Sequence, residues 1–191
     1  KSVYFPDLHE KMLDTTFGYR LKEDVEGRDF TCNALYYDPL NEVVVDPTGT
    51  GIADAQNCIL RVIADSRKGL DLDKLLRYYK FKLRGCGSDS YNKALIRECA
   101  LHTLPKESGS TLIRNISRIA PKKIKTKTEA LAYLVELKQA MTADGNGDVF
   151  ENHLEPLIPE IAARIVETHK VDSVEVDDKW THLLIGAGIG I

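Results

Sequence analysis

The stretch RDFTCNALYYDP, residues 28–39, begins with two charged residues and runs into apolar and aromatic ones. Its apolar side chains alternate with polar ones from Phe30 onward, which predicts a half-buried β-strand. Residues 38–41 predict a turn, and residues 42–45 predict a returning strand. A glycine-rich loop follows, and residues 58–63 predict a third strand. This part of the chain is therefore expected to be mixed α/β, built around a small sheet.

From residue 70 the apolar side chains recur at the period of a helix. One predicted helical face carries five of them: Leu72, Leu75, Leu76, Tyr79 and Leu83. Later helices are predicted over residues 92–104, after a cap at Ser108 or Ser110, after a cap at Thr128, and over residues 159–169. The sequence thus predicts an α/β (α+β) fold in three parts. These are a mixed α/β domain over residues 1–65, an all-helical domain over residues 66–170, and a tail over residues 171–191.

Composition predicts an ordinary globular protein of the cytoplasm. The chain has 191 residues and a net charge of −3, and no apolar run is long enough to span a membrane. Its four cysteines have neither zinc-ligand spacing nor the density of a disulfide framework, which favours a reducing compartment. The first residue is not Met and no signal peptide follows, so we expect a fragment or a processed product.

Three segments, in this order, resemble motifs of the family that contains tRNA nucleotidyltransferases and bacterial poly(A) polymerases. They are RDFTCNALYYDP at residues 28–39, VVVDPTGTGIADAQNCILRVIAD at residues 43–65, and DLDKLLRYYKF at residues 71–81. The family's wording of the first is close to RRDFTxNALAYDP, and of the third EDPxRxLRAxRF. The resemblance implies a partial nucleotidyltransferase head with a short mixed sheet, followed by a helical neck-like region. It implies a parent enzyme that adds nucleotides from ATP or CTP, with Mg²⁺, to the 3′ end of tRNA or another RNA.

The same resemblance implies which residues bind the nucleoside triphosphate: Arg28, Asp29, Asn33, Asp71, Lys74 and Arg77. An arginine guanidinium can form charge-assisted bonds to phosphate. The chain departs from the family's pattern at Gly27, Leu70 and Lys74, where Arg, Glu and Arg are usual. Lysine lacks the planar fork of arginine, which puts base selection in doubt. On a purely structural interpretation, Asp29 and Asn33 only tie the turn together through local hydrogen bonds.

Nucleotidyl transfer needs carboxylates that hold two divalent metal ions. The family supplies them in a GG-x-x-RD…DxD segment before the RDFT stretch, and residues 1–27 contain neither part. We therefore expect the chain on its own to have no catalytic residues and no activity. The alternative hypothesis is a non-catalytic relative that serves as an RNA- or protein-binding module.

Two further clusters could bind a ligand. A basic group could contact RNA phosphates, or could be an ordinary solvated surface: Arg114, Arg118, Lys122, Lys123 and Lys125. Oxygen-bearing side chains recur at calcium-loop positions 1, 3, 5 and 12: Asp144, Asn146, Asp148 and Glu155. Against calcium, Val149 stands where that loop needs glycine, so an acidic linker between helices is the other interpretation. The sequence leaves the oligomeric state open.

Overall fold

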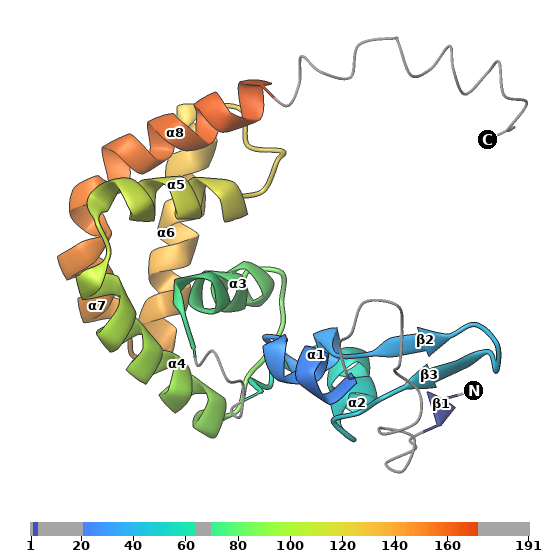
Figure 1. The fold of residues 1–191 in the computed structure, drawn as a ribbon. Helices are drawn as coiled ribbons and strands as arrows, with labels where there is room; N and C mark the ends of the chain where they lie inside the picture. The colour runs from blue at the N-terminus through green and yellow to red at the C-terminus, as the bar shows by residue number, and fades with distance from the viewer. Residues whose placement is uncertain (1, 4–20, 64–69, 172–191) are drawn as a thin grey trace, which may run out of the picture.

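The computed structural model describes residues 2–3, 21–63 and 70–171 (Figure 1). A small sheet and two short helices occupy one end of the molecule, and the later helices form a curved array beside them. The predicted boundary near residue 65 lies outside the described residues, and so does the predicted tail over residues 171–191, apart from Val171, which ends the last helix. The predicted mixed sheet and the helical part are both present.

The sheet has three very short strands. They are β1 (Ser2–Val3), β2 (Tyr36–Asp38) and β3 (Val43–Val45), in the order β1-β3-β2. The central strand β3 is parallel to β1 and antiparallel to β2, with Tyr36 opposite Val45 and Asp38 opposite Val43. The turn between β2 and β3 is the predicted one, since the Asp38 carboxylate accepts a 2.9 Å hydrogen bond from the backbone N–H of Leu40.

The strand predicted from Phe30 to Tyr37 is wrong over its first half. Phe30 makes a single bridge to Val62, and residues Thr31–Asn33 then form a turn of 3₁₀-helix, η2. The cause is local: the Asp29 carboxylate accepts hydrogen bonds from the backbone N–H of Phe30 and the side chain of Asn33. These bonds favour a tight turn over an extended ladder.

The third predicted strand is also absent as a strand. Residues 58–63 make only isolated bridges, Phe30 with Val62 and Ile59 with Gly87. The chain reaches this segment from helix α2 (Gly51–Gln56) through Cys58, whose φ of 52° is left-handed. The chain therefore turns sharply just after the helix ends. The segment that follows makes single bridges to two different partners instead of a ladder.

The helical part follows the predicted periodicity closely. It contains α3 (Leu72–Lys82), α4 (Ser90–Thr103), α5 (Gly109–Ile119), α6 (Lys127–Ala143) and α8 (Ile158–Val171), with 3₁₀ turns η3 (Leu104–Lys106) and η4 (Glu155–Leu157). Ser108 caps α5 as predicted. The cap of α6 is Thr126 rather than Thr128, because Thr126 and Glu129 close a reciprocal capping box. Residues Gly147–His153 form a helix, α7, where the sequence predicted a loop.

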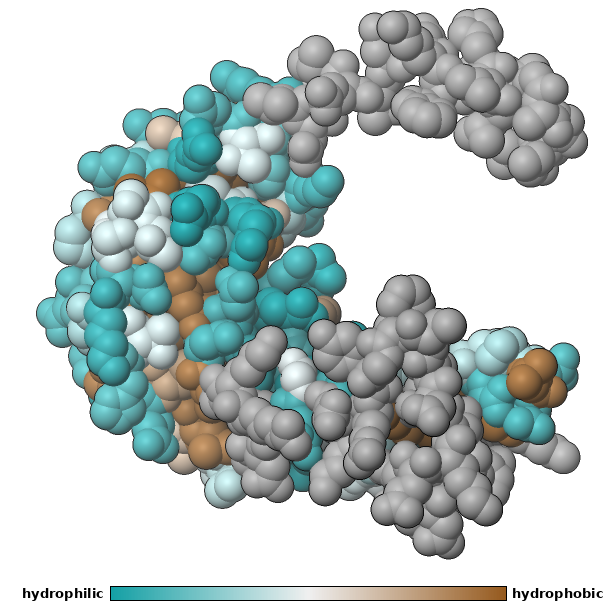
Figure 2. All heavy atoms as spheres, in the orientation of Figure 1, coloured by the Kyte–Doolittle hydropathy of each residue, from teal (hydrophilic) through white to brown (hydrophobic). Residues whose placement is uncertain are grey.

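One apolar cluster connects both ends of the molecule. Helix α3 is at its centre, with Leu75, Tyr78 and Tyr79 fully buried, and it packs against α4, α5 and α6. Phe30, from the start of the RDFT stretch, joins the cluster edge-on to Phe81 at a ring separation of 6.0 Å. Hydrophobic side chains show in the seams between helices under a mostly hydrophilic surface (Figure 2). None of the described helices is long and apolar enough to cross a bilayer.

Candidate functional site

A turn in the RDFT stretch is held by hydrogen bonds to the Asp29 carboxylate. Helix α1 (Leu21–Gly27) ends directly before it, and the side chain of Asp29 is buried. Its Oδ1 accepts hydrogen bonds from the backbone N–H of Phe30 at 2.9 Å and from Nδ2 of Asn33 at 3.1 Å. Asp29 and Asn33 thus make the local bonds of the structural interpretation.

Arg77 of α3 completes this turn from a distant part of the chain. Its Nε lies 2.5 Å from Oδ2 of Asp29, and its side chain is half exposed. Among the described residues Oδ2 has no well-angled hydrogen bond, so the attraction is mainly coulombic. Three residues that the family resemblance selects, Asp29, Asn33 and Arg77, therefore meet in one place.

Arg28 points to a different side. Its guanidinium donates to the Asp24 carboxylate at 2.8 Å and lies over the ring of Tyr36, 5.9 Å from its centre. The Tyr36 hydroxyl donates to the same carboxylate. Burial raises the pKa of Tyr36, and the Asp24 charge adds to this, giving a value of about 12. Partial burial opposes ionisation of Asp24, but the bonds from Tyr36 and Arg28 outweigh it and lower its pKa.

Asp71 and Lys74 lie at the start of α3. The Asp71 carboxylate caps the helix by accepting from the backbone N–H of Lys74 at 2.9 Å. The Lys74 side chain is buried. The residue of α3 that faces Asp29 is Arg77, one turn after Lys74. Arg28 pairs instead with Asp24 of α1.

Two acids that the sequence reasoning did not select organise the glycine-rich loop. Asp46 is buried, and its Oδ1 accepts from the backbone N–H of Thr48 and Gly49 while Oδ2 accepts from that of Ile52. The sequence DPTGT contains a signal for this arrangement, because Asp before Pro and Gly is typical of side-chain-closed turns.

Asp54 is the other acid, and it binds the RDFT stretch to the third segment. It accepts from the Thr31 hydroxyl at 2.5 Å and from Nε of Arg61 at 2.9 Å. Burial raises the pKa of Asp54, but the Arg61 and Thr31 hydrogen bonds outweigh it and hold the pKa below its ordinary value. Gly51 lets the loop approach this closely, since a Cβ there would lie 2.5 Å from the carbonyl oxygen of Thr31.

The described residues do not fit the Mg²⁺ that the resemblance implies. They contain no group of three or more His, Cys, Asp or Glu side chains that could hold a metal ion. Asp29, Asp46 and Asp54 each face backbone N–H groups, hydroxyls or guanidinium groups instead.

The four residues of the calcium hypothesis, Asp144, Asn146, Asp148 and Glu155, each have a protein partner in the structure. Asp144 ends α6 and is buried against Lys82, with Lys93 3.6 Å away and the Tyr78 hydroxyl donating at 3.1 Å. Three further expected ligands also have protein partners: Asn146 bonds Tyr79, Asp148 pairs with Arg97, and Glu155 pairs with Lys138. The oxygens of Asn146 and Asp148 both accept from Arg97, whereas those of Asp144 face α3 and those of Glu155 face Lys138.

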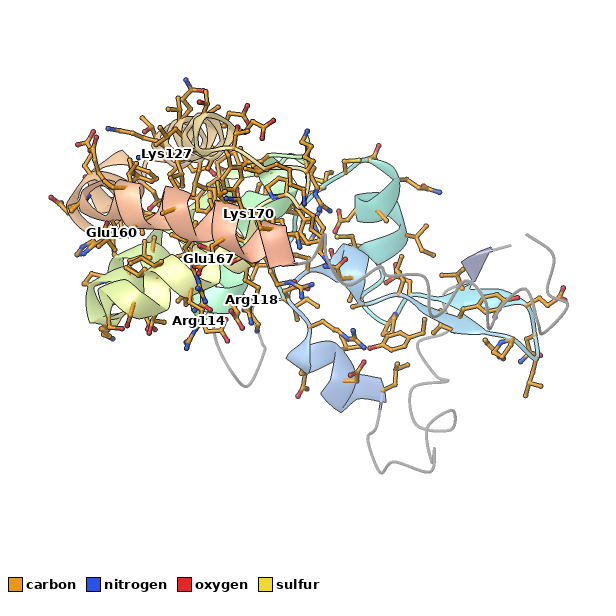
Figure 3. All side chains as sticks on the ribbon, turned by 90° about the horizontal axis from the view of Figure 1, so that it is seen from above. Arg114, Arg118, Lys127, Glu160, Glu167 and Lys170 are labelled. Carbon is orange, nitrogen blue, oxygen red and sulfur yellow. The ribbon has the colours of Figure 1, made fainter. Side chains whose placement is uncertain are left out.

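The predicted RNA-contacting residues spread over α5 and the loop after it. Arg114 is exposed on α5, and Arg118 pairs with Asp73 of α3 at 2.6 Å. Figure 3 shows Arg114 and Arg118 beside α8, which carries Glu160, Glu167 and Lys170. Lys122 and Lys123 are exposed, whereas Nζ of Lys125 donates at 2.8 Å to the carbonyl of His169 near the end of α8.

Comparison with protein families matches residues 5–61 to the poly A polymerase head domain. The match contains the RDFT stretch and the glycine-rich loop, and it supports a nucleotidyltransferase-type head in this part of the chain. No curated protein matches the sequence, and no solved structure matches the fold.

Proposed function

We propose that the chain is part of an RNA 3′-end nucleotidyltransferase of the poly(A) polymerase or CCA-adding type. In this proposal the Asp29 turn and the adjoining face of α3 border the incoming ATP or CTP. The observation that carries it is the 2.5 Å ion pair between Asp29 and Arg77. This ion pair joins the RDFT stretch to the segment at residues 71–81, the two segments that the resemblance assigns to the nucleotide. Of the two, only the RDFT stretch lies within the matched residues 5–61.

The charged groups suit a phosphate ligand. Arg77 is half exposed beside the turn, and its guanidinium has donors left over after one contact to Asp29. Arg28 is also partly exposed, and a triphosphate would have to replace Asp24 as its partner. Asp71, at the start of the same helix, would face the base or a second phosphate, and Lys74 would have to leave its buried position to do the same. The RNA would lie along the exposed basic side chains of α5 and the following loop, Arg114, Lys122 and Lys123.

The second candidate is a non-catalytic module that binds RNA or protein. It is favoured by the missing metal cluster among the described residues and by the pairing of Arg28 with Asp24. Both candidates share the RNA surface, and neither expects nucleotide transfer by the 191-residue chain, so nucleotide binding separates them.

Titration calorimetry of the 191-residue chain with ATP, CTP and inorganic triphosphate tests the nucleotide site. We expect weak binding of similar strength for all three, because charge rather than base identity dominates. Binding should be lost in Arg28→Ala and reduced in Arg77→Ala, and should persist in Arg114→Ala, which removes the same charge from α5. Strong preference for one base, or indifference to the first two changes, would place the nucleotide elsewhere.

A primer-extension assay tests catalysis. With Mg²⁺, any ribonucleoside triphosphate and an RNA primer, we expect the 191-residue chain to incorporate no labelled nucleotide above a protein-free blank. The reason is that the described residues assemble no metal-binding carboxylates. Incorporation above the blank would mean that the chain holds a complete metal site.

A further inference from the structure

Two of the four cysteines lie in segments that run side by side. Cys58 comes just after α2, and Cys86 comes after the turn that ends α3. The backbone N–H of Gly87 donates to the carbonyl oxygen of Cys58 at 2.8 Å, and the N–H of Leu60 donates to the carbonyl oxygen of Gly87 at 2.8 Å. These two bonds make the parallel bridge between Ile59 and Gly87. The residue before each partner of that bridge is a cysteine.

This register makes the two cysteines neighbours across the bridge. In a parallel pairing, residues at the same offset from the bridged pair lie next to each other. Neighbouring segments are about 5 Å apart, which is within the Cα separation of about 4.4–6.8 Å that a disulfide needs. Burial raises the pKa of Cys86, and the nearby side chain of Cys58 raises that pKa further. Both cysteines are free thiols in the structure, close enough to be bonded.

Neither packing nor backbone conformation favours a cysteine at position 58. Cys58 is exposed, whereas a structural free cysteine is usually a small buried apolar group. Its φ of 52° is left-handed, a conformation in which Gly, Asn and Asp are the favoured residues. An exposed thiol next to a second, less accessible thiol is instead the arrangement of a redox-sensitive pair.

The other two cysteines are placed differently. Cys99 is buried in α4, with its sulfur 3.7 Å from the carbonyl oxygen of Asp71. Cys32 is half-buried, and its pKa is raised by burial and then by the charges of Asp29 and Cys86. Among the described residues, no backbone bridge joins the segment of Cys32 to that of Cys86. Cys32 is therefore the competitor that an experiment has to exclude.

We propose that Cys58 and Cys86 are a redox-sensitive pair that a small-molecule disulfide, such as glutathione disulfide, converts to a disulfide bond. The exposed Cys58 thiolate attacks one sulfur of the small disulfide, which forms a mixed disulfide and releases one small thiolate. The Cys86 thiolate then attacks the Cys58 sulfur and expels the second small thiolate. Two electrons and the two thiol protons thus pass from the protein to the small disulfide, which leaves as two thiols. In a reducing compartment such a bond is transient and reports oxidation.

The bond would fasten together the two sides of the Asp29 turn. Residues 58–63 hold the RDFT stretch, since the backbone N–H of Thr31 donates to the carbonyl oxygen of Arg61 at 3.0 Å. The second thiol follows α3, whose Arg77 pairs with Asp29. Oxidation would therefore link the RDFT side to the α3 side covalently, and reduction would release them. This inference does not depend on which ligand the Asp29 turn binds.

Treatment of the reduced 191-residue chain with glutathione disulfide tests this, followed by titration of free thiols and mass spectrometry of its peptides. We expect two of the four thiols to be lost, one bond to form between Cys58 and Cys86, and dithiothreitol to reverse it. Cys86→Ser should stop at a glutathione adduct on Cys58, and Cys58→Ser should form no bond. The matched control is Cys32→Ser, which removes the competing half-buried thiol and should form the bond as the wild type does.

The oxidised chain should melt roughly 5–15 °C above the reduced chain, because the bond closes the loop of residues 58–86 in the unfolded state. In urea the same oxidant should give mixed pairings that include Cys86 with Cys99, the two cysteines nearest in sequence. A main product that joins Cys32 to Cys86, a glutathione adduct that persists on Cys58 of the wild type, or the same selectivity in urea overturns the proposal. An oxidised chain that melts below the reduced one also overturns it, since the fold would not then hold the two thiols at bonding distance.

Discussion

The side chain of Asn146 donates a 2.8 Å hydrogen bond to the hydroxyl of Tyr79, and both residues are fully buried. The bond fixes the turn between α6 and α7 to the centre of α3. Asp144, two residues earlier, is held against Lys82 and the Tyr78 hydroxyl of the same helix. The polar contacts of residues 144–146 therefore hold the end of α6 against α3.

We predict that Asn146→Ala lowers the free energy of unfolding by about 1–3 kcal/mol, because it leaves the Tyr79 hydroxyl buried without a partner. Tyr79→Phe made in the Asn146→Ala background should cost little more, since both halves of the bond are then gone. Urea unfolding of the two single variants and the double variant gives this coupling. Strictly additive effects would show that the two side chains do not interact.

Millimolar calcium should leave the melting temperature of the chain unchanged. A ligand that binds only the folded state raises that temperature, and the oxygens of residues 144–155 are engaged with cations and hydroxyls of the protein. Differential scanning calorimetry with calcium and with EDTA measures the difference. A clear rise that Asp144→Asn removes would restore the calcium site.

Leu76→Ala should lower the free energy of unfolding by roughly 2–5 kcal/mol, as removal of a buried leucine does elsewhere. Leu76 lies in the core cluster on the buried face of α3. Val135→Ala is the matched control, because Val135 is 55% exposed on α6, and its effect should stay under about 0.5 kcal/mol. Equal effects in chemical denaturation would mean that α3 does not pack as described.

Stability should fall in acid partly through Asp54. Its folded pKa lies below its ordinary value of 3.8, so the stabilisation from its ionised form is present above that value. It is lost as the pH falls through the folded pKa. The difference in unfolding free energy between the wild type and Asp54→Asn should thus be largest near neutrality and shrink below about pH 4.

Urea unfolding between pH 7 and pH 2 measures that difference. Arg61→Gln is the companion variant, since it removes the guanidinium bonded to Asp54 and should flatten the same pH dependence. A difference between wild type and Asp54→Asn that stays constant with pH would show that the Asp54 carboxylate contributes no linked stability.

Local signals explain why the helical part could be predicted. The apolar period of α3 and the cap at Ser108 depend only on residues within a few turns, and both appear in the structure. The local pattern gave a wrong prediction where side-chain hydrogen bonds favour a different backbone conformation. The alternating pattern after Phe30 predicted a strand, but hydrogen bonds to the Asp29 side chain turn the chain into η2. Helix α7 was missed because it is short, follows Gly145 closely and begins with Gly147.

The sequence by itself determined the order of sheet and helices and selected Asp29, Asn33 and Arg77 through their resemblance to a known family. Only the tertiary structure decided that Arg77 meets Asp29, that Arg28 pairs with Asp24, and that the acids of residues 144–155 pair with cations of the protein. It alone brought Cys58 beside Cys86. The physical reason is that periodicity and capping act over a few residues. Pairing of charges and of thiols depends instead on how separate segments pack.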